Sequence, residues 1–75
     1  MNEGDAIKGK ELCLKAISID PKSVKAHYLL GKLHKILGSI EEAKSEFIQT
    51  LQLQQDSKEA KKELESLSKV ETKPP

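Results

Sequence analysis

The sequence contains no arginine and no tryptophan, and it has one cysteine, one tyrosine and one phenylalanine. Without arginine, the chain lacks the planar guanidinium group that makes two-point contacts with phosphate and guanine. Its formal net charge is only +1, so attraction to a nucleic-acid backbone is also weak. We therefore expect no nucleic-acid partner.

Disulfides and long apolar runs are absent as well. Cys13 has no second cysteine in the chain to pair with, and disulfides are typical of oxidising compartments. No apolar run approaches the roughly 18 residues that a membrane-spanning helix needs, and none resembles the apolar part of a signal peptide. We therefore expect a cytoplasmic protein with no membrane partner.

Charged and apolar residues are present in similar amounts, 33% and 36%. Alanine, leucine, lysine and glutamate are frequent, which favours helix over sheet. A chain of 75 residues makes one small domain that buries about 60% of its unfolded surface. The composition predicts an all-α fold.

The first half of the chain predicts two helices. Apolar residues recur at helical spacing from Asp5 to the residue before Asp20, where the following Pro21 disfavours further helix. Ser23 is the expected N-cap of the second helix. Gly38 is expected to end that helix in a left-handed conformation.

The second half predicts two further helices, each opened by a capping box. Ser39 with Glu42 forms the first box, and Asp56 with Glu59 forms the second. Residues 72–75 are expected to be a disordered tail.

Helical periodicity also predicts which side chains are packed. On the first helix these are Ala6, Leu12, Cys13, Ala16, Ile17 and Ile19. On the third they are Ile40, Ala43, Phe47, Thr50, Leu51 and Leu53, with Glu46 among the residues that face water. On the fourth, Glu63 and Glu65 are expected on the solvated outer face with the lysines.

The chain resembles itself at a shift of 34 residues, which is the period of tetratricopeptide repeats. Cys13 falls on Phe47 and Ala16 on Thr50, and Leu30 falls on Leu64. The stretch Val24 to Ser57 resembles one complete repeat of that family. The matching residues, which the resemblance implies pack the repeat, are Leu30, Gly31, Gly38, Ala43, Phe47 and Leu51.

The resemblance implies an α-solenoid fragment of antiparallel helix-turn-helix units. Residues 1–22, with Gly9, Cys13, Ala16 and Pro21, resemble the second helix of a truncated repeat. The resemblance implies that residues 23–56 form the complete repeat and residues 57–71 the C-terminal capping helix, where a charge at Glu65 is expected to end the array. His27 and His34 depart from the family pattern, because Trp and Tyr are usual there.

The family also implies a place for a ligand. The first helix of each repeat lines a concave groove that binds a peptide or a partner's helix, and in this register Lys25, Tyr28, Leu29, Lys32 and Ile36 line it. Because this helix carries lysines and no acid, the expected ligand is an acidic segment with apolar anchors. A solvated lysine-rich helix is the competing interpretation.

Catalysis and metal binding find little support. His27 and His34 are two helical turns apart and could approach Cys13, but no zinc-ligand spacing accompanies them. We interpret all three as packing residues, and we expect no enzyme activity and no cofactor. A structural terminating segment, or one that self-associates through the uncovered face of the first helix, is the alternative to a binding module.

Overall fold

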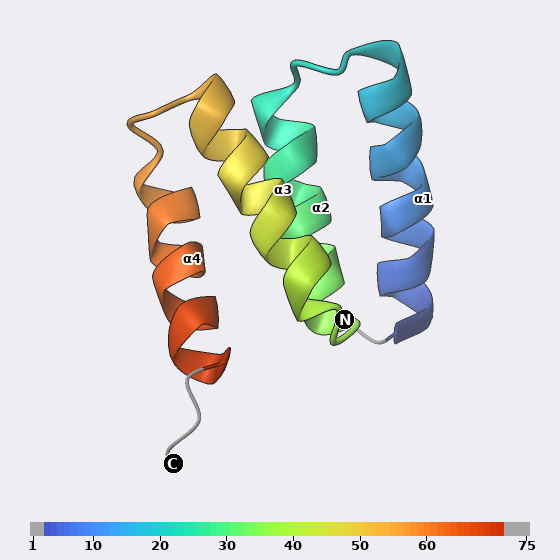
Figure 1. Ribbon diagram of the computed structural model, residues 1–75. Helices are drawn as coiled ribbons and strands as arrows, with labels where there is room; N and C mark the ends of the chain where they lie inside the picture. The colour runs from blue at the N-terminus through green and yellow to red at the C-terminus, as the bar shows by residue number, and fades with distance from the viewer. Residues whose placement is uncertain (1–2, 72–75) are drawn as a thin grey trace.

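The computed structural model describes residues 3–71, and these form four antiparallel helices. They are α1 (Glu3–Ile19), α2 (Val24–Ile36), α3 (Ile40–Leu53) and α4 (Lys58–Glu71). Short turns join each helix to the next at alternating ends of the molecule, and α1 and α4 lie on opposite sides of the α2–α3 pair (Figure 1). The predicted all-α helix-turn-helix architecture is confirmed. The predicted tail at 72–75 lies outside the described residues.

The turn between α1 and α2 agrees with the sequence prediction. α1 ends at Ile19, one residue before Asp20, whose carboxylate accepts a hydrogen bond of 3.2 Å from the Lys22 backbone N–H. Ser23 caps α2 by accepting a hydrogen bond of 3.2 Å at its side-chain oxygen from the Ala26 N–H. The cap satisfies one of the backbone donors that the first turn of a helix leaves unpaired.

Gly38 produces the tight turn between α2 and α3. Its φ is +81°, a left-handed conformation that glycine adopts without the steric cost of a Cβ. The predicted capping box at Ser39 is wrong, because the Ser39 side chain makes no capping hydrogen bond. The reversal is instead fixed by backbone hydrogen bonds, including one of 2.8 Å from the Ser39 N–H to the His34 carbonyl.

The start of α4 differs from the predicted capping box. Ser57, rather than Asp56, precedes the first helical residue, and its side-chain oxygen accepts a hydrogen bond of 3.3 Å from the Ala60 N–H. Ser57 is buried and Asp56 is exposed. The buried hydroxyl therefore caps the helix, and the predicted capping box at Asp56 and Glu59 is wrong.

The helices pack mainly against their neighbours in sequence, α2 against α1 and α3, and α3 against α4. Two apolar clusters result. The cluster between α1 and α2 consists of Ala6, Cys13, Leu30 and Leu33, and the cluster between α3 and α4 consists of Ala43, Phe47, Ala60 and Leu67. None of the described helices is both long enough and apolar enough to cross a membrane.

Four apolar residues predicted to be packed are exposed, namely Leu12, Ala16, Ile19 and Leu53. Leu12 is 65% exposed, Ile19 80% and Leu53 37%. Leu12 lies in the middle of α1, whereas Ile19 is the last residue of α1 and Leu53 the last residue of α3. Apolar residues lie around much of α1, so periodicity does not identify its packed side.

Candidate functional site

The five residues predicted to line a groove share one face of α2. Lys25, Leu29, Lys32 and Ile36 are exposed and Tyr28 is half-buried. Their spacings of three and four residues place them in one row along the helix. We call this row the α2 stripe.

Two adjoining hollows lie between α1 and the α2 stripe, and we call them together the α1/α2 groove. One hollow, of about 480 Å³, lies between Gly9 and Leu12 on α1 and Leu29, Leu33 and Ile36 on α2. The other, of about 250 Å³, extends toward Ala16, Ser23 and Ala26. Leu12, Cys13 and Leu29 line both hollows. The groove therefore has apolar walls over much of its length.

Charged side chains also line the α1/α2 groove. Asp5 and Lys32 line the larger hollow, and Lys25 lines the smaller one. The α1/α2 groove is accordingly mixed in charge, although α2 itself carries no acid.

Tyr28 connects the α2 stripe to the core. Its ring centroid lies 5.7 Å from that of Phe47, with the rings tilted by 59°. The Lys32 ammonium lies 5.6 Å from the Tyr28 centroid, within the range of a cation–π contact. Packing on Phe47 therefore holds Tyr28, and Tyr28 in turn positions the Lys32 charge over its ring.

Acids of α4 lie close to lysines of α2. Lys35 Nζ lies 2.9 Å from Glu63 Oε1, and Lys25 and Glu59 line the same hollow of about 430 Å³ with Tyr28. The prediction that Glu63 belongs to the solvated outer face is therefore wrong, since its side chain is 19% exposed and bonded to α2. Part of the positive charge of α2 is balanced within the chain.

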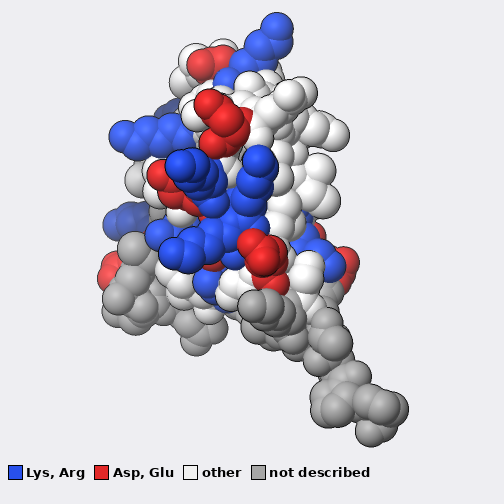
Figure 2. Space-filling view, turned by 90° about the vertical axis from the view of Figure 1, so that its left-hand side faces the viewer, with Lys and Arg blue, Asp and Glu red and all other residues white. Residues whose placement is uncertain are grey.

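The outward side of α4 carries a different surface. Lys58, Lys61, Lys62 and Glu65 are exposed, as predicted. Seen from the α4 side of the molecule, lysine and acidic side chains are interspersed beside an uncharged area (Figure 2). This mixture of signs is unlike the single-sign surface that a polyanion selects.

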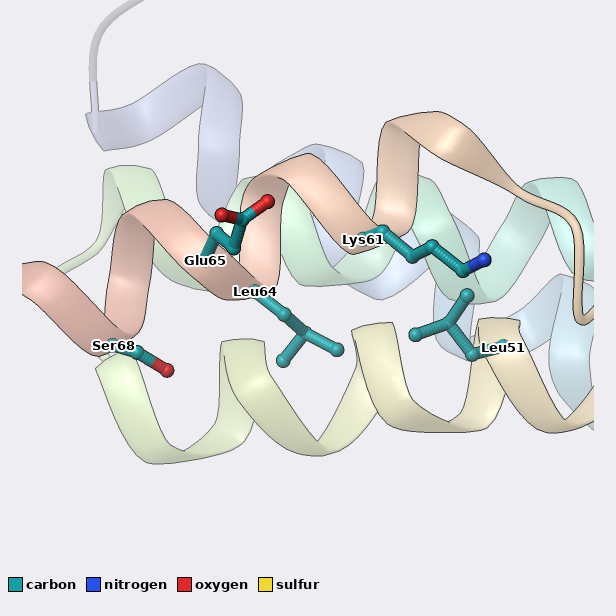
Figure 3. Close-up of a pocket in the computed structure, with 5 residues that line it drawn as sticks. All are labelled: Leu51, Lys61, Leu64, Glu65 and Ser68. Atoms are coloured by element: carbon teal, nitrogen blue, oxygen red, sulfur yellow. The ribbon is translucent and has the colours of Figure 1, made fainter.

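A further hollow, of about 580 Å³, lies between α3 and α4. Leu51 and Leu64 point toward each other across it, whereas Glu65 points away (Figure 3). Lys61 and Ser68 complete its lining. The hollow therefore combines one apolar leucine pair with three polar residues.

Most of the predicted packing residues lie at helix contacts. A Cβ on Gly31 would lie 2.8 Å from the Phe47 ring, and one on Gly9 would lie 3.2 Å from Leu33. Both glycines therefore permit close approach of neighbouring helices. Other predicted packing residues that are buried or packed against the clusters are Cys13, His27, Leu30, Ala43, Phe47 and Leu51.

Three predicted packing residues differ. Ala16 is exposed at the α1/α2 groove because no described helix covers that side of α1. Gly38 makes no close packing contact, because a Cβ there would meet nothing within 4 Å, and its role is the left-handed turn. His34 is only half-buried, and its Nδ1 is a buried atom with no hydrogen-bond partner among the described residues.

His27 makes two polar contacts that the sequence prediction missed. Its Nδ1 lies 2.8 Å from Glu46 Oε1 and its Nε2 lies 2.8 Å from the Pro21 carbonyl oxygen. Glu46 was predicted to face water, but it is half-buried against α2. Tetratricopeptide repeats usually have Trp where this chain has His27. A polar ring at that buried position is the one sequence signal that could have suggested a polar partner such as Glu46.

The residues considered for catalysis do not form a reactive constellation. The described residues contain no group of three His, Cys, Asp or Glu side chains that could hold a metal ion. Burial, and secondarily the charge of Glu46, raise the pKa of the Cys13 thiol. A raised pKa lowers the fraction of reactive thiolate. Both ring nitrogens of His27 are already within hydrogen-bond distance of oxygen atoms of Glu46 and Pro21, so neither is available to a substrate.

Comparison with protein families identifies a tetratricopeptide repeat at residues 12–45. This span covers the second half of α1, all of α2 and the first part of α3, and it is one repeat period long. No curated protein matches the chain. The match, together with the antiparallel helix-turn-helix order of the four described helices, supports assignment of this part of the chain to the tetratricopeptide repeat family.

Proposed function

We propose that the chain is a non-catalytic protein-interaction module that binds a segment of a partner protein along the α2 stripe and the α1/α2 groove. The observation that carries this proposal is the apolar surface of the groove. Leu29 and Ile36 remain 41% and 44% exposed beside a hollow of about 480 Å³. Contiguous exposed apolar surface bordered by polar residues marks interaction sites.

The shape of the α1/α2 groove favours an amphipathic helix as the ligand. Two helices form its walls, and its two hollows follow one another along them. Apolar side chains spaced by three or four residues on a partner helix would fall on one face and enter such a groove. An extended peptide with apolar anchors is a second way of filling it.

The charge preference of the ligand rests on Lys25 and Lys32. Lys35 is bonded to Glu63, so it contributes less positive field to a ligand. Lys25 and Lys32 both border the α1/α2 groove, and a ligand with acidic residues beside its apolar anchors would complement them. Asp5 limits this preference at one end of the groove. We expect moderately acidic rather than polyanionic ligands.

The preferred test uses a designed amphipathic peptide with a leucine face flanked by glutamates, with a scrambled peptide as control. Amide chemical-shift changes in the ¹⁵N-labelled chain should concentrate at Leu29, Lys32 and Leu12. Leu29→Ser and Lys32→Glu should each weaken binding at least several-fold. Absence of shifts with a series of such peptides contradicts the proposal.

Matched variants separate the groove from general surface effects. Ile48→Ser changes a similarly exposed apolar residue, 46% against 41% for Leu29, on α3 outside the groove. Lys15→Glu reverses an exposed lysine on α1. Neither variant should alter binding. Equal losses for Ile48→Ser and Leu29→Ser would show that the peptide does not select the groove.

A structural or self-associating role is the second candidate, and the exposed apolar residues of α1 favour it. Ile7 is 49% exposed, Leu12 65% and Leu14 50%. Sedimentation of the chain over a range of concentrations tests this role. Leu14→Glu would reduce association through the side of α1 away from the groove, and Leu12→Glu would reduce association through the groove.

The proposal also includes the boundaries of the repeat units and the cellular compartment of the protein. In it, residues 1–22 are the second helix of a preceding unit, 23–56 one whole repeat and 57–71 a capping helix. The exposed Glu65 in α4 supports the capping role, since Gly31 holds the equivalent place in the repeat beside Phe47. The single buried thiol suits a reducing compartment such as the cytoplasm.

A further inference from the structure

We propose that His27 is a protonation-dependent clamp that holds the turn between α1 and α2 against α3. The ring is 6% exposed and lies between Pro21 in that turn and Glu46 in the middle of α3. This role does not depend on which partner the chain binds.

Both ring nitrogens of His27 face oxygen atoms that accept hydrogen bonds. Nδ1 lies 2.8 Å from a Glu46 carboxylate oxygen, and Nε2 lies 2.8 Å from the Pro21 backbone carbonyl oxygen. A carbonyl oxygen only accepts, and so does an ionised carboxylate. Neutral imidazole has one N–H, whereas imidazolium has two. With Glu46 ionised, only the protonated ring makes both hydrogen bonds at once.

The two bonds join segments that local structure does not join. Within the turn, the Asp20 N–H donates to the Ala16 carbonyl at 2.8 Å and the Ser23 N–H donates to the Asp20 carbonyl at 3.1 Å. These bonds define the shape of the turn but do not attach it to α3. His27 provides that attachment through its two nitrogens.

The charged and polar groups around His27 favour the protonated ring on balance. Glu46 is the titratable group on α3 that faces the ring, and the same carboxylate also acts on the Cys13 thiol of α1. In the turn, the Asp20 carboxylate accepts from the Lys22 N–H, and α2 itself carries no acid. Burial opposes protonation, but the bonds to Glu46 and Pro21 and the charge of Glu46 outweigh it and raise the pKa of His27.

The sign of the pH effect follows from this raised pKa. The clamp stabilises the fold fully below the ordinary histidine pKa of about 6.5, and that contribution is lost as the pH rises through the raised value. Deprotonation leaves one of the two acceptors without its hydrogen bond. Because Ser23 and Ala26 line the near end of the α1/α2 groove, loosening of this turn would change the groove at that end.

Nuclear magnetic resonance of the intact chain tests the clamp. The His27 ring should titrate with a midpoint above that of free histidine, and Glu46→Gln should lower this midpoint. Glu65→Gln, which neutralises an exposed glutamate on α4, should leave it unchanged. A midpoint that does not respond to Glu46→Gln overturns the proposal.

Amide hydrogen exchange provides the second readout. After correction for the intrinsic effect of pH on exchange, protection of the Asp20 and Ser23 amides should fall across the His27 titration, whereas α4 amides such as Ala60 should change less. In Glu46→Gln this pH-linked loss should shrink. Should that variant not fold, unchanged protection of the turn across the titration of the unaltered chain still overturns the clamp.

Discussion

Gly31 and Phe47 define the closest approach of α2 and α3. A Cβ at position 31 would lie 2.8 Å from a ring carbon of Phe47, which is itself fully buried. Real Cβ atoms are essentially never that close to another heavy atom. The ring and the missing side chain are therefore complementary parts of one helix contact.

Replacing Gly31 by leucine should consequently destabilise the fold. Overpacking of a tight core contact costs about 1 to 3 kcal/mol, and the buried ring has little room to move away. Urea unfolding followed by circular dichroism measures this loss. Gln49→Leu introduces the same side chain at an exposed site of α3 and should change the free energy of unfolding little. Equal stability of both variants would contradict the helix contact.

Gly38 offers a separate test of backbone conformation. A Cβ there would contact nothing within 4 Å, so any cost of Gly38→Ala arises from its φ of +81°. We expect a loss of about 1 kcal/mol, because a left-handed conformation is unfavourable for residues with a Cβ. Gly38→Asn should lose less, since asparagine tolerates this region better. Thermal unfolding of the two variants checks the order, and Gly38→Ala as stable as the parent would contradict it.

Replacing each of the two histidines of α2 by phenylalanine should change the stability of the fold in opposite directions. His34→Phe removes a buried Nδ1 that has no partner within the described part of the chain, and we expect a gain of about 1 kcal/mol. His27→Phe removes two hydrogen bonds and leaves Glu46 without its partner, and we expect a loss of about 1 to 3 kcal/mol. Chemical unfolding at pH 6 compares them directly. Loss of stability in both variants would contradict the conclusion that, among the described residues, His27 is hydrogen-bonded and the His34 Nδ1 is not.

Leu67 and Leu53 test the packing of α4. Leu67 is 1% exposed in the cluster with Phe47 and Ala60, whereas Leu53 is 37% exposed at the end of α3. Leu67→Ala should cost about 2 to 5 kcal/mol through lost burial and a cavity, and Leu53→Ala should cost clearly less. Similar losses would mean that α4 is not anchored by Leu67.

Sequence reasoning predicted the fold well where small residues occur at fixed spacing. Gly31 and Ala43 lie at helix contacts and Gly38 has the expected left-handed turn, because each requirement is local or depends on one neighbouring helix. The repeat period gave the order of the helices without further information. Ser23 was predicted correctly for the same local reason.

The predictions that were wrong depend on which neighbour a side chain has. Glu46 is on the edge of the packed face of α3, and only the position of His27 on α2 makes it a hydrogen-bonded residue. Glu63 likewise bonds to Lys35, 28 residues away. Leu12 and Ala16 follow the helical period but lie where no described helix covers them. Periodicity in one helix contains none of this information.

The row of helices has a consequence for how the molecule opens. The cluster of Leu30 and Leu33 is separate from that of Phe47 and Leu67, and contacts run mainly from each helix to the next. In such one-dimensional arrangements, stability is close to a sum over adjacent pairs. We therefore expect α4 to detach as a unit while α1, α2 and α3 remain folded, so that α1 and α4 exchange their amide hydrogens through different openings.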